Sequence, residues 1–257
     1  MKLGVCSVTF RDKSPQEIID LTKQAALDAI EWGADTHVPA GDMQTAQEIG
    51  EATRNQGLEI SSYGSYYRLA DYGDNEEAFQ EVLQSAEVLG APAIRVWAGV
   101  TGSDKASDDY RGLVVQDARR VADLASKHGI SIHLEFHGNT LTDTKESARQ
   151  LMEEIDHDNV FTYWQPPNSV SIKERLASIE AVKPWITNVH IFYWYSFEDR
   201  LNLAEGQTEW LQYLREIFQD GKERYVLMEF VKYDEEEQFL EDAQTLHELK
   251  QTLKPSL

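Results

Sequence analysis

Short apolar segments alternate eight times with amphipathic helical segments, and this repeat constrains the fold more than any other feature of the sequence. The segments predicted as strands are Leu3–Val8, Ala29–Trp32, Leu58–Ser62, Ala93–Trp97, Ser131–Glu135, Val160–Trp164, Asn188–Phe192 and Tyr225–Glu229. Strict alternation of strands and helices produces a parallel sheet with right-handed crossovers, and eight such units close into a barrel. We therefore predict an α/β fold in which residues 1–257 form one (β/α)8 TIM barrel.

The helical segments carry start and stop signals that support this division of the chain. Ser14 suits the N-cap of the first helix, with Glu17 at the capping-box position. Gly57, Gly90 and Gly129 each close a helical segment just before a strand, where the backbone commonly turns left-handed. The order of helix, glycine and strand is the one expected of a barrel built from repeated units.

An open, doubly wound sheet is the alternative fold for a chain that alternates in this way. That fold predicts a glycine-rich phosphate loop after the first strand. The segment Thr9-Phe10-Arg11-Asp12 follows the first strand here and contains no glycine. The barrel is therefore the favoured fold.

The charge balance limits the partners that the chain can have. Its 45 acidic and 24 basic residues leave a formal charge of −21, which disfavours contact with a phosphate backbone. No run of about 18 apolar residues suggests a membrane span, and the first residues lack the apolar core of a secretory signal. We expect a cytoplasmic protein without nucleic-acid or membrane partners, and the sequence leaves open whether it is a homo-oligomer.

The single cysteine, Cys6, lies in the apolar run at the amino terminus. One cysteine excludes an intramolecular disulfide and a zinc site built from several thiolates. Because free cysteine is commonly buried, we expect Cys6 to be part of the interior.

Polar side chains alternate with apolar ones in the fifth predicted strand. Successive side chains of a strand point to opposite faces, and in a barrel one face meets the helices while the other points inward. If Ile132 and Leu134 meet the helices, His133, Glu135 and His137 line the interior. This strand is predicted to bring three ionisable groups inside the barrel.

The same alternation assigns inward positions on four other strands. Glu229 lies at the carboxyl end of the last strand, and His190 alternates with apolar neighbours in the seventh. Arg95 and Trp97 point inward from the fourth strand, and Glu31 from the second. Since active sites of such barrels lie at the carboxyl ends of the strands, these groups mark a candidate site.

A divalent metal ion would explain why two glutamates and a histidine converge in one cavity. A buried carboxylate without a partner costs several kcal/mol or is neutralised by protonation. Carboxylate and imidazole ligands suit Mn, Mg, Zn or Co, and leave positions open for water or substrate. The alternative is that each group is paired separately, for example Glu135 with Arg95.

At these residues the sequence resembles the xylose-isomerase-like superfamily of sugar phosphate isomerases and epimerases, which includes the tagatose-epimerase-like barrels. The resemblance covers essentially the whole chain. The segments that carry it are Ala29-Ile30-Glu31-Trp32, Leu134-Glu135-Phe136-His137, Tyr163-Trp164-Gln165-Pro166-Pro167-Asn168, Val189-His190-Ile191 and Met228-Glu229-Phe230.

The resemblance implies one metal held by Glu135, Gln165, His190 and Glu229. The family usually has aspartate where this chain has Gln165, so a charged ligand is replaced by a neutral carbonyl. The two glutamates still balance the charge of a divalent ion. Compared with a site that has aspartate, we expect the metal to bind more weakly and to be a stronger Lewis acid. Gln165 either ligates the metal or donates its amide to the substrate, which would leave three protein ligands.

The resemblance implies a metal-dependent isomerase or epimerase acting on a sugar, keto-sugar or related polyol in carbohydrate metabolism. The metal would bind the carbonyl and the adjacent hydroxyl, and stabilise the enediolate formed when Glu135 or Glu229 removes a proton. The other glutamate would return the proton on the opposite face. His137 would relay a proton or hydrogen-bond a hydroxyl.

Aromatic residues follow several of the predicted strands and suit stacking against a carbohydrate-like ligand. Arginine and lysine near the same strand ends, including Arg200, suit a carboxylate or phosphate, although no glycine-rich phosphate cradle is evident. The residues that we predict to contact the substrate are Glu31, Tyr63, Arg95, Trp97, Asn168, Trp194 and Lys232.

Two other functions use the same predicted site. The first is a lyase, dehydratase or decarboxylase acting on a keto-acid or oxidised sugar, because the same enediolate can lose water or break a carbon–carbon bond. The second is a sugar-binding barrel whose catalytic site has decayed. The identities of the substrate and of the metal stay open.

Overall fold

The structure is a computed structural model that describes residues 1–71 and 75–253. Eight parallel strands close into a barrel in the order of the sequence. The strands are β1 (Lys2–Cys6), β2 (Ala29–Gly33), β3 (Glu59–Arg68), β4 (Ala93–Trp97), β5 (Ser131–Leu134), β6 (Val160–Trp164), β7 (Ile186–Ile191) and β8 (Tyr225–Met228).

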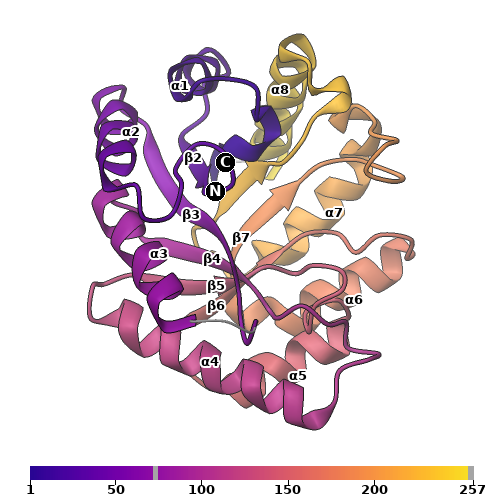
Figure 1. The fold of residues 1–257 in the computed structure, drawn as a ribbon. Helices are drawn as coiled ribbons and strands as arrows, with labels where there is room; N and C mark the ends of the chain where they lie inside the picture. The colour runs from indigo at the N-terminus through magenta and orange to yellow at the C-terminus, as the bar shows by residue number, and fades with distance from the viewer. Residues whose placement is uncertain (72–74, 254–257) are drawn as a thin grey trace.

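Eight helices surround the strands (Figure 1), and the predicted (β/α)8 barrel is confirmed. They are α1 (Pro15–Gln24), α2 (Met43–Asn55), α3 (Asn75–Leu89), α4 (Asp108–Ser126), α5 (Lys145–Ile155), α6 (Ile172–Val182), α7 (Gln207–Ile217) and α8 (Glu236–Leu253). Short 3-10 helices are η1 (Ser7–Phe10), η2 (Lys183–Trp185), η3 (Leu203–Gly206) and η4 (Lys232–Asp234).

The helix signals in the sequence have the predicted geometry. Ser14 accepts a hydrogen bond from the backbone of Glu17, whose side chain accepts one from the Ser14 backbone, and this is a complete capping box. Gly57, Gly90 and Gly129 have φ values of 75°, 82° and 70°, a region that glycine adopts without strain. These caps separate the helices from the strands that follow.

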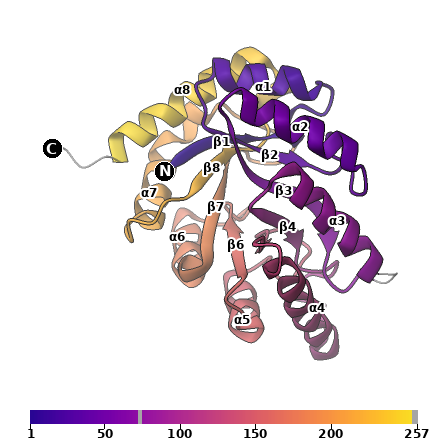
Figure 2. The same ribbon diagram turned by 90° about the vertical axis from the view of Figure 1, so that its left-hand side faces the viewer.

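The first strand is shorter than the sequence predicts. It ends at Cys6, and the residues that follow form η1 instead of continuing to Val8. The ring of helices closes where α8 lies beside α1 (Figure 2): His247 hydrogen-bonds the carbonyl of Ala25 over 3.0 Å. Phe10 of η1 packs edge-on against Phe239 of α8, with ring centroids 5.4 Å apart.

The main hydrophobic core lies between the sheet and the helices, and includes Trp32, Ile94 and Leu134. Inside the barrel the buried apolar cluster is much smaller, and consists of Cys6, Val8, Tyr163 and Leu227. The remaining interior holds buried polar and charged groups, among them Glu31, Arg95, His133, Glu135 and His190. Burial of Cys6 is confirmed, and it raises the pKa of the thiol to about 12, so the thiol is neutral.

A bulge in β3 determines which of its side chains point inward. Ile30 pairs with Ile60, but the next residue, Glu31, pairs with Ser62, so β3 carries one extra residue at this point. Ser62 therefore points inward beside Glu31, and Tyr63 points outward toward the helices. No helix within the described part of the chain is long and apolar enough to cross a membrane.

Candidate active site

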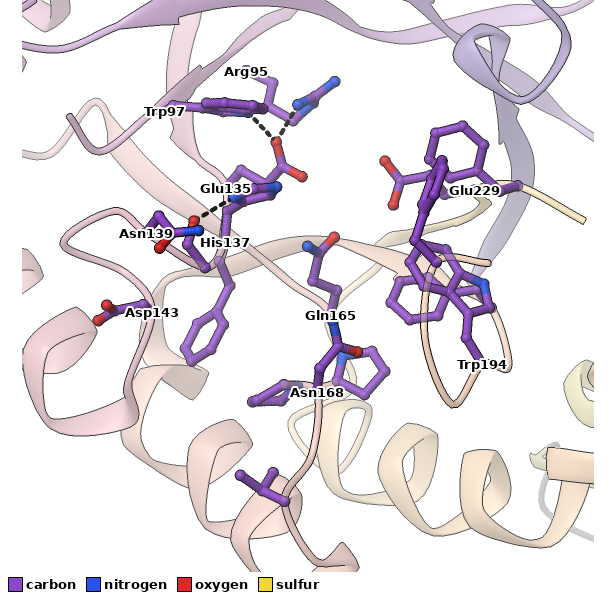
Figure 3. Close-up of a pocket in the computed structure, with 18 of the residues that line it drawn as sticks. Arg95, Trp97, Glu135, His137, Asn139, Asp143, Gln165, Asn168, Trp194 and Glu229 are labelled. Atoms are coloured by element: carbon purple, nitrogen blue, oxygen red, sulfur yellow. Dashed lines mark hydrogen bonds and ion pairs between the residues drawn. The ribbon is translucent and has the colours of Figure 1, made fainter. Parts of the chain in front are cut away.

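A cavity of about 570 Å³ lies at the carboxyl ends of the strands. Figure 3 shows Arg95, Trp97, Glu135 and His137 on one side, and Glu229 and Trp194 on the opposite side. Gln165 and Asn168 approach from the loop that follows β6. Side chains from separate strands thus meet at the end of the barrel where active sites form.

Glu135, His190 and Glu229 converge at the base of this cavity. One donor atom from each lies within 4.8 Å of the other two. The Nδ1 atom of His190 is 3.4 Å from Oε2 of Glu229 and 3.9 Å from Oε1 of Glu135. All three side chains are buried. The structure therefore brings together three of the residues that sequence parity placed inside the barrel.

Gln165 also faces this group. Its Oε1 atom lies 2.9 Å from Nδ1 of His190, so the amide oxygen points toward the same space as the carboxylates. This orientation is compatible with a carbonyl ligand, and ligation by Gln165 stays a prediction.

Arg95 lies at the base of the cavity and binds the carboxylate of Glu135, one of the two glutamates of this group. Its Nε atom donates to Oε1 of Glu31 over 2.9 Å, and its Nη1 atom donates to Oε2 of Glu135. The Nε1 atom of Trp97 donates to the same Glu135 oxygen over 2.6 Å. Oε2 of Glu135 is thus occupied by two donors, whereas Oε1 faces His190. The ion pair considered from the sequence is present, and it leaves one Glu135 oxygen for a metal.

Glu31 lies beneath the cavity and not in its lining, which corrects the prediction that it contacts substrate. Its Oε2 atom accepts hydrogen bonds of 2.7 Å from both Ser62 and Tyr163. Burial would raise the pKa of Glu31, but Arg95 and the donors around it lower the pKa well below its usual value. Glu31 is an ionised anchor for Arg95.

The buried charges fit a divalent cation. Three carboxylates, Glu31, Glu135 and Glu229, surround the guanidinium of Arg95. Burial would lower the pKa of His190, but its acidic neighbours, Glu229 among them, raise the pKa well above its usual value. When His190 is neutral, which is the form that ligates a metal, the group carries a formal charge of −2. Burial would raise the pKa of Glu229, but His190 and Arg95 lower it. A divalent ion at the donor atoms of Glu135, His190 and Glu229 would neutralise the group.

His137 follows β5 at the rim of the cavity. Its ring stacks on Trp97 with centroids 4.5 Å apart and an angle of 20°. Its Nδ1 atom lies 2.7 Å from the carbonyl of Gly138, and since a carbonyl only accepts, Nδ1 carries the hydrogen. None of the residues that the structure describes hydrogen-bonds Nε2. In the neutral ring, Nε2 is therefore the nitrogen with the lone pair, and it has no protein partner among these residues.

His133 points inward as predicted, but it lies away from the cavity. Its Nε2 atom is 2.8 Å from the hydroxyl of Ser131, and its Nδ1 atom is 3.0 Å from the hydroxyl of Thr187. Burial lowers the pKa of His133 to about 3, so the ring is neutral.

Four of the predicted substrate contacts line the cavity: Arg95, Trp97, Asn168 and Trp194. The prediction for Tyr63 is corrected, because its side chain points outward and its hydroxyl donates to the carbonyl of Val38 over 2.7 Å. Lys232 begins η4 and is not among the residues that line the cavity, and its ammonium lies 5.4 Å from the ring of Tyr233. Its contact with a substrate stays a prediction.

Sequence parity missed several residues that line the cavity, among them Arg11, Phe136 and Phe230, whereas Tyr66 is one of the aromatic residues expected near the strand ends. Tyr66 and Phe230 both have a φ of 57°, so the backbone leaves the extended conformation at these positions. Alternation after the inward-facing Glu229 would put Phe230 on the helix side, but this turn directs its ring toward the cavity. Arg11 follows η1, for which the predicted strand gave no signal.

The chain is similar to known proteins over most of its length. The family model of xylose isomerase-like TIM barrels matches residues 19–249. A 3-dehydroshikimate dehydratase from Bacillus anthracis is 29% identical over 205 residues, which are 74% of this chain and 71% of that protein.

Solved structures share the fold at lower sequence identity. The probable 3-DHS dehydratase AsbF, involved in petrobactin synthesis in Bacillus anthracis, has a TM-score of 0.81 and 20% identity, covering 96% of this chain and 99% of that one. D-psicose 3-epimerase from Clostridium cellulolyticum H10, solved with D-tagatose, has a TM-score of 0.75 and 18% identity over 99% and 100% of the two chains.

A third structure is a xylose isomerase-like barrel from Mycobacterium smegmatis in complex with magnesium, with a TM-score of 0.76 and 17% identity over 98% of both chains. The match of the family model over nearly the whole barrel agrees with the segments that carried the resemblance. The chain belongs to the xylose isomerase-like TIM barrel family.

Proposed function

We propose that this chain is a metal-dependent dehydratase that removes water from a hydroxylated keto-acid. The observation that carries the proposal is the geometry of His137, whose Nδ1 atom donates to Gly138, so that Nε2 is the basic nitrogen of the neutral ring. The similarity to a 3-dehydroshikimate dehydratase supports the same reaction class. The lyase considered as an alternative from the sequence is thus favoured over the isomerase.

The carboxylates are less suited than His137 to carry a proton. Arg95 and Trp97 already occupy one oxygen of Glu135, and its other oxygen belongs to the donor set with Glu229 and His190. A group that holds a cation is a poorer base than a neutral imidazole with an available lone pair. His137 is the base that remains at the rim of the cavity.

In the proposed reaction, Nε2 of His137 takes a proton from the carbon next to the substrate carbonyl. The electron pair of that C–H bond forms the new double bond as the neighbouring C–O bond breaks. The protonated His137 then gives its proton to the departing hydroxide, so one water leaves and the imidazole is neutral again. A divalent cation, when bound by Glu135, His190 and Glu229, would supply Lewis-acid polarisation of the carbonyl.

An epimerase is the second candidate function. Oxygens of Glu135 and Glu229 lie within 4.8 Å of one another around His190, and they face each other across the cavity (Figure 3). Two carboxylates on opposite faces of a substrate suit removal and return of a proton. The structural similarity to D-psicose 3-epimerase favours this alternative at the level of the fold.

The two functions are separated by incubating the magnesium-loaded protein with 3-dehydroshikimate and with D-psicose in deuterated water. We expect loss of one water from the keto-acid and no deuterium in the recovered ketose, both measured by mass spectrometry. Deuterium in D-psicose without loss of water from the keto-acid would favour the epimerase. A protein that is inactive on every ketone and binds no metal would instead be the decayed barrel.

The role of His137 is tested by His137→Gln. We expect kcat to fall by about 10² to 10⁴-fold, which is the usual contribution of a general base, with magnesium affinity unchanged. His157, which hydrogen-bonds Asp123 outside the cavity, provides the matched control. His157→Gln is expected to keep the parental kcat. Full kcat in His137→Gln would contradict the proposed mechanism.

A further inference from the structure

The basic residues that the sequence suggested for an acidic substrate group are either paired with carboxylates or lie outside the lining of the cavity. Arg95 is 2% exposed and lies between Glu31 and Glu135. Arg200 donates to Asp234 and lies over the ring of Phe197, which lines the cavity, but Arg200 itself is not part of that lining. Lys232 also lies outside that lining. A different residue must therefore meet a substrate carboxylate, if the pocket binds one.

Arg11 is the second arginine that lines the cavity, and only one carboxylate pairs with it. Its Nε atom donates to Oδ2 of Asp35 over 2.6 Å, which fixes the direction of the guanidinium. The same guanidinium lies 5.6 Å from the ring of Phe230, and its Nη2 atom is 3.4 Å from the hydroxyl of Tyr66.

The two terminal nitrogens of Arg11 remain available. Nη2 has only the long contact with Tyr66, and Nη1 is hydrogen-bonded by none of the residues that the structure describes. The side chain is 46% exposed, against 2% for Arg95. An arginine that is anchored through Nε and presents Nη1 and Nη2 matches the two oxygens of a carboxylate.

We propose that Arg11 is the specificity-determining residue that binds the carboxylate of the substrate. This inference rests on the proposed function, because it explains how the cavity distinguishes a keto-acid from a neutral ketose. A chain with a formal charge of −21 repels anions in general, so a carboxylate substrate needs a local cation of this kind.

The surroundings of Arg11 favour a carboxylate over a phosphate. Its charge is already partly balanced by Asp35, and none of the described residues that line the cavity is a lysine. A phosphate carries more charge and is usually held by several donors or by a helix amino terminus. One planar guanidinium beside an apolar ring suits a group with a single negative charge.

The inference is tested with two ligands that differ only in this group, shikimate and its methyl ester. Their affinities for the magnesium-loaded protein are measured by calorimetry, so turnover is not required. We expect the parent to bind the acid about 10 to 100-fold more tightly than the ester. Arg11→Gln is expected to abolish this preference while leaving the affinity for the ester unchanged.

Three further variants separate recognition from structural effects. Arg11→Lys keeps the positive charge but loses the paired terminal nitrogens of the guanidinium, and Asp35→Asn weakens the contact that orients it. Both variants are expected to give an intermediate preference for the acid over the ester. Arg149, which is 61% exposed on α5 and pairs with Glu153, is the matched control. Arg149→Gln is expected to keep the parental preference.

The inference is overturned if Arg11→Gln retains the preference for the acid, or if the parent binds the two ligands equally or binds neither. Failure of the inference can be distinguished from failure of the proposed function. An Arg11-dependent preference without dehydration would leave the inference intact and contradict the reaction. Dehydration with an unchanged KM in Arg11→Gln would contradict the inference and leave the proposed reaction intact.

Discussion

Two arginines reach the same cavity, but their surroundings give them different roles. Arg95 belongs to the floor, which we define as Glu31, Arg95 and Glu135, and both ends of its guanidinium are paired with carboxylates. Arg11 belongs to the rim, which we define as Arg11, Asp35, Tyr66 and His137, and only its Nε atom is paired with a carboxylate. The floor is almost fully buried, whereas the rim is partly open to solvent.

The comparison shows that two properties decide whether an arginine can bind a ligand: how deeply it is buried, and how many of its nitrogens are already hydrogen-bonded. The Arg95 guanidinium is committed to holding Glu31 and Glu135 as carboxylates, so it positions a metal-binding residue and does not attract substrate. Arg11 retains two nitrogens that can meet a ligand. The residue type alone does not distinguish the two roles.

The largest expected effect is on the floor. Arg95→Met would leave Glu31 and Glu135 buried without their cation, and breaking a buried ion pair in this way typically costs about 3–5 kcal/mol. We expect a loss of this size in the free energy of unfolding, measured by urea titration at neutral pH. A loss below about 1 kcal/mol would show that Arg95 is not the anchor of the floor.

A buried carboxylate without an ion pair should have a raised pKa, whereas the pKa of Glu31 is lowered. Asp242 of α8 accepts hydrogen bonds from the Leu203 backbone over 2.9 Å and from Gln238 over 2.8 Å. Its burial raises its pKa from 3.8 to about 6. Because the pKa of the folded state is the higher one, stability that is present at low pH is lost as the pH rises through about 6.

Asp242→Asn removes this loss, because the amide oxygen can still accept both hydrogen bonds. We expect the variant to be more stable than the parent by about 1–2 kcal/mol at pH 8 and nearly equal to it at pH 4. Urea unfolding across this pH range measures the difference. A variant that is less stable at both pH values would show that the carboxylate of Asp242 is needed in its charged form.

The smallest expected effect on stability is at the rim. The Arg11–Asp35 pair is partly exposed, and such pairs contribute about 0–1 kcal/mol. Arg11→Met is therefore expected to change the free energy of unfolding by less than about 1 kcal/mol, in the same urea experiment as Arg95→Met. Equal losses in the two variants would remove the distinction between floor and rim.

The barrel was predictable because its signals are local and repeat along the chain. Alternation within a strand places Glu135, His190 and Arg95 inside, and a helix cap such as Ser14 needs only its own neighbours. These patterns depend on the periodicity of a strand or a helix, which the surrounding structure preserves.

The rest of the site depends on backbone that leaves this periodicity. The bulge in β3 and the positive φ of Tyr66 decide which tyrosine reaches the cavity, so Tyr63 was assigned in error. Arg11 follows a 3-10 helix at the end of β1, and Glu31 is covered by Ser62 and Tyr163 from other strands. Such contacts are set by tertiary packing, which a single sequence does not display.

The central claim is that Glu135, His190 and Glu229 hold one divalent metal, and titration of manganese into chelator-treated protein by calorimetry tests it most directly. We predict one ion per chain, affinity at least about 10-fold lower in Glu229→Gln, and higher affinity in Gln165→Asp, which adds a charged ligand. Glu223→Gln, in an exposed side chain that contacts Lys2, is the matched control with parental affinity. Absence of binding in the parent, or equal affinity in Glu229→Gln, would contradict the account.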